Sequence, residues 1–293
     1  MKLPLISIIT INYNSLEDTL ELLASLHPCD YPNIEIIVVD NHSEVDPTES
    51  ISRQYPNVKI IKSERNLGFA GGNNLGVKAS NGKYIFFLNN DAIVTENFFG
   101  PIVNFLDQND GIGMISPKVL YPDGKTIQYA GAIRINPFTG RGKRLGLGEQ
   151  DHGQYDTIQK TDLGHGGAMI VPRKVIDKVG MMPEMYFLYY EEHDWAEMMK
   201  REGFNIYYFG KASILHKESA TIGAVSPVKT YYMSRNRILF LKRNSKGIQY
   251  LIALFFIIFL SIPLNTLRMM LKRQFKLIKV YYQGVFWHLN PST

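Results

Sequence analysis

Short apolar runs that alternate with helix-like segments constrain the fold of this chain more than any other feature. Residues 5–11, 34–39, 58–61 and 84–88 are four such runs, each largely apolar and rich in β-branched or aromatic side chains. Runs of this length without polar alternation are typical of strands that are buried on both faces of a parallel sheet. The first helical segment between them opens at the capping residue Ser15. The alternation predicts βαβ units, and therefore an α/β fold with a mostly parallel central sheet.

The second half of the chain follows this pattern less regularly. We expect strands at residues 112–120, 166–171 and 206–209, and helices at residues 96–106, 173–179 and 191–201. Residues 121–162 are polar and rich in glycine. Such segments form hairpins or mobile loops, and they often cover a binding site.

Charge and hydropathy separate the C-terminal tail from the rest. The chain has 32 Lys and Arg against 27 Asp and Glu, and ten of the basic residues but none of the acidic ones lie beyond residue 229. Within this tail, residues 247–267 form a run of 21 residues without a charge. At about 1.5 Å per residue, a helix of this length could cross a bilayer core of about 30 Å. Of the two anionic partners that a basic tail could have, the apolar run favours a membrane over a nucleic acid. The alternative to a membrane helix is a helix buried in the protein core.

The distribution of basic residues predicts how the tail meets the membrane. Lys and Arg flank the apolar run on both sides, whereas a simple crossing collects them on the cytoplasmic side only. We therefore expect an interfacial helix, or a re-entrant hairpin that turns near Pro263, at the cytoplasmic face. The single cysteine, Cys29, excludes an internal disulfide and fits a reducing compartment. We also expect no secretory signal, because a strand-like run begins within the first few residues.

Polar residues follow three of the predicted strands, at 10–14, 40–43 and 89–91. In open α/β sheets, ligands bind at the carboxyl ends of the strands. Asn and Asp are also common in turns, so each segment alone could be a turn. Polar ends on three strands of one α/β unit favour a binding site.

Residues 66–74 read Asn-Leu-Gly-Phe-Ala-Gly-Gly-Asn-Asn and are expected to approach a ligand closely. We expect a helix to begin near Gly72 or Asn73 and to run to about residue 79, with an N-terminus that attracts phosphate. The segment has neither the G-x-G-x-x-G order after the first strand nor a G-K-[ST] ending, so it is neither a usual dinucleotide site nor a P-loop. A simple loop is the alternative.

These four polar segments, together with residues 166–170, 189–195, 216–219 and 232–237, resemble family 2 glycosyltransferases in order and spacing. The rhamnosyltransferase-like branch is the most similar, and the resemblance covers residues 5–240. It implies a type-A nucleotide-binding α/β domain at residues 1–240, followed by a basic, apolar, membrane-associated helical tail at 241–293.

The resemblance also implies a site for a nucleotide-sugar donor. In this site, Asp40 would hydrogen-bond to the nucleotide base of the donor, and the ring of Tyr13 would pack against that nucleotide base. Arg235 and Arg237 would contact a diphosphate or form a solvated basic face. The donor-binding residues that it implies are Thr10, Tyr13, Asn14, Asp40, Asn66, Gly68, Asn73, Asn89, Asn90 and Arg235.

The same resemblance implies a divalent cation, Mg²⁺ or Mn²⁺, on Asp91 and His216. Asn rather than Asp at position 89 lowers the charge of this site, yet such a cation needs only one or two carboxylates when it also binds substrate phosphates. A lone histidine such as His216 is otherwise more often structural.

The acidic cluster at the start of the helix at 191–201 is expected to supply the general base. The family has an aspartate at the position of Glu192, so Glu192 is the expected base and Asp194 the alternative. Negative charge at a helix N-terminus is also favourable in itself, which offers a purely structural reason for the cluster.

We therefore expect an inverting sugar transferase that uses a dTDP- or UDP-sugar and a saccharide acceptor, which we take to be lipid-linked, in cell-surface polysaccharide assembly. The Q-x-x-R-W motif of processive synthases is absent, since Trp195 and Trp287 are the two tryptophans; this favours one transfer per event. The alternatives are a catalytically inactive nucleotide-sugar-binding protein and a sugar nucleotidyltransferase. A sugar nucleotidyltransferase would have a Gly-rich loop containing Arg and Lys after the first strand. Residues 10–14 do not have this composition.

Overall fold

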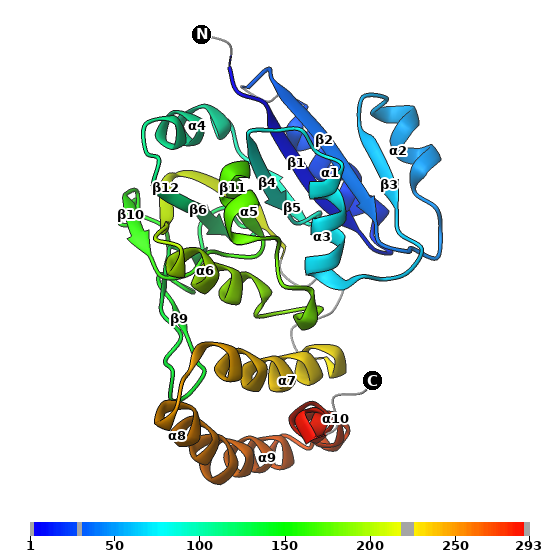
Figure 1. Ribbon diagram of the computed structural model, residues 1–293. Coiled ribbons are helices and arrows are strands. Elements are labelled where there is room, and N and C mark those ends of the chain that lie inside the picture. The colour runs from blue at the N-terminus through cyan, green and yellow to red at the C-terminus, as the bar shows by residue number, and fades with distance from the viewer. Residues whose placement is uncertain (1–2, 28–30, 218–225, 290–293) are drawn as a thin grey trace.

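The computed structural model describes residues 3–27, 31–217 and 226–289. A central sheet with helices packed on it forms the body of the molecule, and a group of C-terminal helices lies beneath it (Figure 1). Cys29 and the last two residues of the 216–219 motif lie outside the described residues.

The N-terminal half forms the parallel part of the sheet. Its strands pair in the order β3-β2-β1-β4, with bounds β1 (Ile6–Asn12), β2 (Ile34–Asp40), β3 (Lys59–Lys62) and β4 (Tyr84–Leu88). The connecting helices are α1 (Leu16–Leu26), α2 (Thr48–Gln54) and α3 (Gly68–Lys78). All four strands match the predicted apolar runs to within a residue or two.

Burial on both faces explains why these runs lack polar alternation. Ile37 and Val39 belong to the main core, while Val38 between them packs with Leu23 and Ile51 in a second cluster under α1 and α2. The sheet is therefore covered on both sides at β2, as expected for a parallel sheet.

Helix α3 begins at Gly68, ahead of the expected start near Gly72 or Asn73, so that prediction was wrong. Its glycines are needed for packing against β1: a Cβ at Gly72 would lie 2.8 Å from Ile11, and one at Gly76 would collide with Ile9. The low helix propensity of glycine hid the helix in the sequence, and close contact with the strand compensates for that propensity.

The second half completes the sheet. Strand β11 (Ala168–Pro172) runs antiparallel between β4 and β6 (Ile112–Leu120), and β12 (Asn205–His216) runs parallel to β6. Six of the eight strands on the path β10-β12-β6-β11-β4-β1-β2-β3 thus point the same way, which confirms the mostly parallel sheet. The helices are α4 (Phe99–Asp107), α5 (Arg173–Val179) and α6 (Glu191–Arg201).

Strand β12 is longer than the predicted residues 206–209, because its second half pairs with β5 (Ala92–Val94). This pairing sets His216 opposite Ala92, next to the end of β4. It is the contact that brings the C-terminal part of the domain to the polar strand ends.

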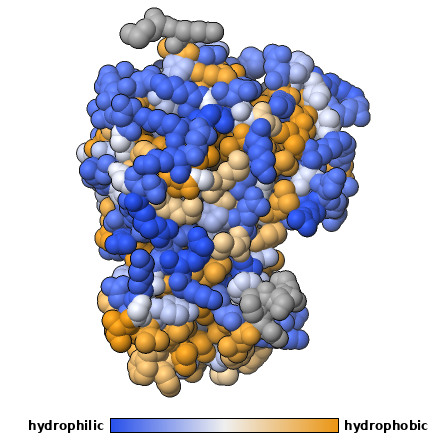
Figure 2. All heavy atoms as spheres, viewed as in Figure 1, coloured by the Kyte–Doolittle hydropathy of each residue, from blue (hydrophilic) through white to orange (hydrophobic). Residues whose placement is uncertain are grey.

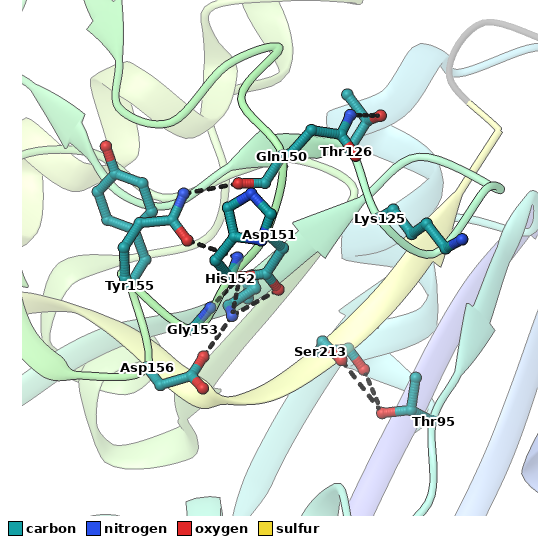
Figure 3. Close-up of polar contacts among 12 residues, drawn as sticks. Thr95, Lys125, Thr126, Gln150, Asp151, His152, Gly153, Tyr155, Asp156 and Ser213 are labelled. Carbon is teal, nitrogen blue, oxygen red and sulfur yellow. Dashed lines mark hydrogen bonds and ion pairs between the residues drawn. The ribbon is translucent and has the colours of Figure 1, made fainter.

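Residues 121–162 form short strands rather than an open loop. These are β7 (Ile127–Tyr129), β8 (Ala132–Ile133), β9 (Lys143–Arg144) and β10 (Ile158–Thr161). The loop before β10 is fixed by the buried Lys118, which bonds to Asp151 at 2.8 Å and to Asp156. Figure 3 shows this loop, in which Gln150 also donates to Thr126 at 2.9 Å. The expected hairpin is therefore the pair β8–β9.

The C-terminal helices are α7 (Pro227–Asn244), α8 (Ile248–Phe256), α9 (Ile262–Leu271) and α10 (Phe275–Phe286). A π-helical segment at Ile257–Ser261 joins α8 to α9. Together they form one helix of 24 residues, Ile248–Leu271, that is long and apolar enough to cross a membrane. The predicted domain boundary at residues 240/241 falls inside α7.

The hairpin turn expected near Pro263 is not present. Pro263 lies inside this continuous helix, directly after the π-helical segment Ile257–Ser261, and the chain reverses only at residues 272–274. The two helices on either side of that reversal, α9 and α10, are in contact, and α10 packs along α7.

The long apolar helix packs on the domain along one face only. Ala253 and Ile257 contact Ile238 and Leu241 of α7, whereas the outward side chains are exposed. Figure 2 shows the resulting hydrophobic surface at the base of the molecule, over α8 and α9. The exposed residues are Ile248, Leu251, Ile252, Phe255, Ile258, Phe259, Leu260, Leu264, Leu267, Met270 and Leu271.

Candidate active site

A cavity of about 1240 Å³ lies at the carboxyl ends of β1 and β4, between α3, α6, α7 and the β8–β9 hairpin. Nine of the predicted site residues line it: Tyr13, Asn66, Gly68, Asn73, Asn89, Asn90, Asp91, Glu192 and His216. The other predicted residues, Thr10, Asn14, Asp40, Asp194 and Arg235, are not among the lining residues.

The ends of β1 and β2 are joined behind the cavity wall. Asn12, which is buried, donates to Asp40 at 3.1 Å and to Ser43 at 3.0 Å. Asn14 has φ of 53° and accepts a hydrogen bond from the backbone of Glu44 at 2.8 Å. These bonds fix the turn from which the half-exposed ring of Tyr13 reaches the cavity.

Asn41 connects the end of β2 to the glycine-rich segment. Its amide donates to Asn66 at 3.0 Å and to the carbonyl of Gly68 at 3.1 Å, and its oxygen accepts from Leu67 N at 2.9 Å. Asn41 lines the cavity but was not selected from the sequence, although it directly follows Asp40. Asn73, by contrast, bonds back to Phe69 within its own helix at 3.1 Å.

The end of β4 meets the end of β12 in a polar cluster. His216 Nε2 lies 3.1 Å from Asp91 Oδ1 and 3.2 Å from Asn89 Nδ2. The other ring nitrogen, Nδ1, donates to Oε1 of the buried Gln128 at 2.6 Å, since an amide oxygen can only accept. Gln128 therefore holds the tautomer in which Nε2 presents its lone pair to Asp91 and Asn89.

This pair fits a divalent cation that shares its ligands with a substrate. A carboxylate oxygen and an imidazole lone pair face each other across 3.1 Å at the cavity wall. In the described part of the chain, no group of three or more His, Cys, Asp and Glu side chains could hold an ion by itself. Phosphate and water would have to supply the remaining ligands, as is usual for Mg²⁺.

A strained aromatic segment leads into α6. Phe187, Tyr189 and Tyr190 have φ of 64°, 69° and 77°, a conformation that bulky residues seldom adopt. The buried amide of Asn236 donates to the carbonyls of Tyr186, Leu188 and Tyr189 at 2.9, 2.8 and 2.8 Å. Surrounding contacts thus impose a backbone strain of the kind that is common at functional sites.

This segment sets the acidic start of α6 against the cavity. Glu191 and Glu192 both line it, and each has a buried Oε2 with no hydrogen-bond partner among the described residues. Burial, followed by the charge of Glu192, holds the pKa of Glu191 well above its usual range. Asp194 instead bonds to Arg243 Nε at 2.6 Å and to Asn244 Nδ2 at 2.7 Å, so both of its oxygens point to α7.

Comparison with known proteins identifies the family. Residues 7–180 match the family described as glycosyl transferase family 2. The chain belongs to glycosyltransferase family 2. Family membership excludes the sugar nucleotidyltransferase alternative, and the enzyme is a glycosyltransferase.

Two curated relatives of this glycosyltransferase are of similar length. A low-salt glycan biosynthesis hexosyltransferase, Agl10 of Haloferax volcanii, is 27% identical over 239 residues, which is 80% of this chain and 74% of that protein. The dTDP-rhamnosyl transferase RfbF of Shigella flexneri is 25% identical over 224 residues, 72% of each chain. The second match confirms the resemblance to the rhamnosyltransferase-like branch.

Solved structures confirm the fold. The mannosyltransferase PcManGT from Pyrobaculum calidifontis, in complex with GDP-Man and Mn²⁺, superposes with a TM-score of 0.60 at 12% identity, covering 100% of this chain and 89% of that one. Other matched proteins are longer, and the glycosyltransferase spans 24% of one relative and 44% of one solved chain.

The two arginines that were expected to contact a diphosphate or to form a solvated basic face are bonded to other parts of this glycosyltransferase. Arg235 lies over the Trp287 ring at 4.6 Å and bonds to Asn236 Oδ1 at 2.9 Å. Arg237 donates to the carbonyl of Thr139 and to Ser261, each at 2.7 Å. Arg235 is buried and Arg237 is partly buried, and their partners come both from the domain and from the C-terminal helices.

The basic residues that do line the cavity were missed in the sequence. They are Arg141, Lys143 and Arg144 of the hairpin and Lys229 of α7. A segment rich in glycine and without regular spacing shows no sign of which way its side chains point. The charge of residues 131–148, which hold four Lys or Arg and no Asp or Glu, was the signal that could have revealed them.

Proposed function

We propose that this glycosyltransferase moves one sugar at a time, with inversion, from a nucleotide-diphosphate sugar to a hydroxyl of a saccharide acceptor. The single observation that carries the proposal is the position of Glu192 at the cavity wall, with a carboxylate oxygen that has no partner among the described residues. A carboxylate in this state can take the proton of an acceptor hydroxyl as the hydroxyl attacks the anomeric carbon. Asp194 is the weaker candidate, because Arg243 and Asn244 occupy both of its oxygens.

The donor occupies the β4 end of the cavity in this proposal. Tyr13, Asn66, Asn73, Asn89 and Asn90 form the wall there. Asp40 supports that wall from behind through its bonds to Asn12 and to the backbone of Ser43. The name of the relative RfbF supports a dTDP-sugar, and UDP-sugars are the second donor class to test.

Asp91 and His216 would hold the divalent cation, Mg²⁺ or Mn²⁺. When bound, such an ion neutralises the charge that develops on the departing diphosphate. Gln128 orients His216 for this role through Nδ1, and the amide of Asn89, 3.2 Å from Nε2, would have to give up that contact to the ion. The Mn²⁺ in the mannosyltransferase complex of similar fold supports the assignment.

The acceptor side faces the C-terminal helices. The exposed apolar face of α8–α9 supports an interfacial position on the cytoplasmic leaflet, with basic flanks on anionic lipid headgroups. A lipid-linked saccharide would then reach the cavity from the membrane surface. The names of the relatives, which refer to glycan biosynthesis and rhamnosyl transfer, support a role in cell-surface polysaccharide assembly.

Donor turnover by matched variants tests this proposal. The purified enzyme is supplied with dTDP-, UDP- and GDP-sugars plus Mn²⁺ or Mg²⁺, and release of the nucleoside diphosphate is measured. Glu192→Gln keeps the shape of the side chain, so donor binding should persist while turnover falls by about 10²- to 10⁴-fold. Asp194→Asn is the matched control and should keep most of its activity at a lowered melting temperature. The opposite result would move the base to Asp194, and the absence of turnover with every donor would favour the inactive binding protein.

A further inference from the structure

The cavity has an acidic end and a basic end. The acidic lining residues are Asp91, after the end of β4, and Glu191 and Glu192, at the start of α6, whereas Arg141, Lys143 and Arg144 come from the β8–β9 hairpin. The donor diphosphate and its cation belong to the acidic end in the function proposed above. The basic end has no assigned ligand.

Arg141 and Lys143 are not used in holding the fold together. Both are exposed, and neither forms a salt bridge with any other described residue. The fourth basic residue of this region, Arg134, pairs with Glu197 at 3.1 Å instead. Burial and also the like charge of Arg141 lower the pKa of Arg237, so the two positive charges are close enough to repel each other.

The hairpin backbone that carries these two side chains is fixed. The backbone of Asn136 donates to the carbonyl of Arg141 at 3.0 Å, and the hydroxyl of Tyr190 donates to the carbonyl of Gly140 at 3.0 Å. Gly140 has φ of 63°, and a Cβ there would lie 2.9 Å from Arg237, so the tip packs tightly on α7. Because the backbone is already ordered, Arg141 and Lys143 can bind an anion without the entropy cost of ordering a loop.

The same hairpin reaches the membrane-facing helix. Arg237 donates one hydrogen bond to the carbonyl of Thr139 in the hairpin and one to Ser261 in the π-helical segment, each of 2.7 Å. Ser245, two residues before the apolar run, donates to the carbonyl of Pro137 at 3.1 Å. The hairpin that carries the basic lining residues is thus bonded to the helix whose exposed hydrophobic surface lies at the base of Figure 2.

A ligand that fits this arrangement has a saccharide at one end, a phosphate in the middle and an apolar chain at the other end. Guanidinium and ammonium groups form charge-assisted hydrogen bonds to phosphate oxygens. We propose that Arg141 and Lys143 form an anion subsite that binds the phosphate or diphosphate joining the acceptor saccharide to its lipid. The inference rests on the lipid-linked acceptor proposed above and adds the residues that recognise it.

Binding of farnesyl diphosphate to the full-length enzyme in detergent micelles tests this subsite without any transfer reaction. Calorimetry is done in chelator, so that no cation recruits a diphosphate to Asp91. Arg141→Gln/Lys143→Gln should weaken binding by about 10-fold or more, since two charge-assisted contacts are lost. Lys125→Gln/Lys160→Gln removes two exposed charges outside the cavity and should leave the affinity unchanged.

Two further probes separate the sources of affinity. Inorganic pyrophosphate has the charge without the chain, and farnesol has the chain without the charge; both should bind at least 10-fold more weakly than farnesyl diphosphate. Equal affinity for pyrophosphate would overturn the lipid assignment in favour of a free phosphate ligand. Unchanged binding of farnesyl diphosphate by the folded double variant, checked by thermal melting, would overturn the subsite itself. Donor turnover by the same variants reports separately on the proposed function.

Discussion

Replacing Asn236 with alanine should destabilise the protein and impair its chemistry together. The buried amide donates to three carbonyls of the strained segment at 186–189. An amide has two protons, so its loss leaves about two buried carbonyls without a partner, at about 1–3 kcal/mol each. A total of about 3 kcal/mol corresponds to a fall of roughly 6–12 °C in melting temperature for a domain of about this size.

The effect on activity follows from the backbone strain. Phe187, Tyr189 and Tyr190 each adopt a positive φ that costs about 1–3 kcal/mol and persists only under external constraint. Once Asn236 is removed, the segment can relax and carry Glu191 and Glu192 away from the cavity wall. We expect kcat for donor turnover to fall about 10-fold or more, while the KM for donor changes little because Asn89 and Asp91 lie in the turn between β4 and β5, outside this segment.

Thermal unfolding by circular dichroism and steady-state donor turnover measure the two effects. Asn265→Ala is the matched control: this amide donates to Tyr281 at 3.1 Å and to Ser261 at 3.4 Å, away from the cavity. It should lower the melting temperature only slightly and leave kcat unchanged. If Asn236→Ala melts early but turns over donor at the wild-type rate, the strained segment has no role in positioning the acidic residues.

The remaining predictions address the cation, a buried acid and the membrane. Asp91→Asn should lower turnover by roughly 10²-fold, as measured over a range of Mn²⁺ concentrations, and full activity of this variant in excess chelator would refute the cation site. Gln128→Leu should weaken cation binding by about 10- to 100-fold, seen as a shift in the Mn²⁺ titration of activity, because His216 loses its orienting partner. The raised pKa of Glu191 means that the folded state binds its proton more tightly than the unfolded state, so stability should fall as pH rises above the ordinary value of 4.5. Glu191→Gln should flatten that fall in melting curves from pH 5 to 8, and an unchanged slope would show that Glu191 is ionised in the fold. Phe255→Glu/Phe259→Glu places charges on the exposed apolar face and should release the enzyme from sedimenting anionic vesicles, whereas continued binding would refute attachment through α8–α9.

Local patterns in the sequence were sufficient for the parallel half of the sheet. Residues 36–39 and 84–88 are continuous apolar runs because both faces of β2 and β4 are covered, and that requirement is visible residue by residue. The bounds of β6, α5 and α6 were also predicted without error. The polar ends of β1 and β4 also follow from strand position, and the resemblance to the family then implied roles for Tyr13, Asn89 and Asp91 before any contact was known.

Contacts between distant segments decided the rest. Helix α3 starts at Gly68 because its glycines fit against β1, and glycine composition by itself argues against a helix. His216 reaches Asp91 only through the pairing of β12 with β5, which spans more than a hundred residues of sequence.

The arginines and the hairpin show the same limit. The sequence shows that Arg235, Arg141 and Asp194 carry charged side chains. The direction in which each side chain points depends on which distant element packs beside it. Arg235 turns to Trp287, Asp194 turns to Arg243, and Arg141 is left at the cavity. Periodicity records which residues are apolar and therefore buried, whereas polar side chains obtain their roles from partners that only the folded chain brings within hydrogen-bonding distance.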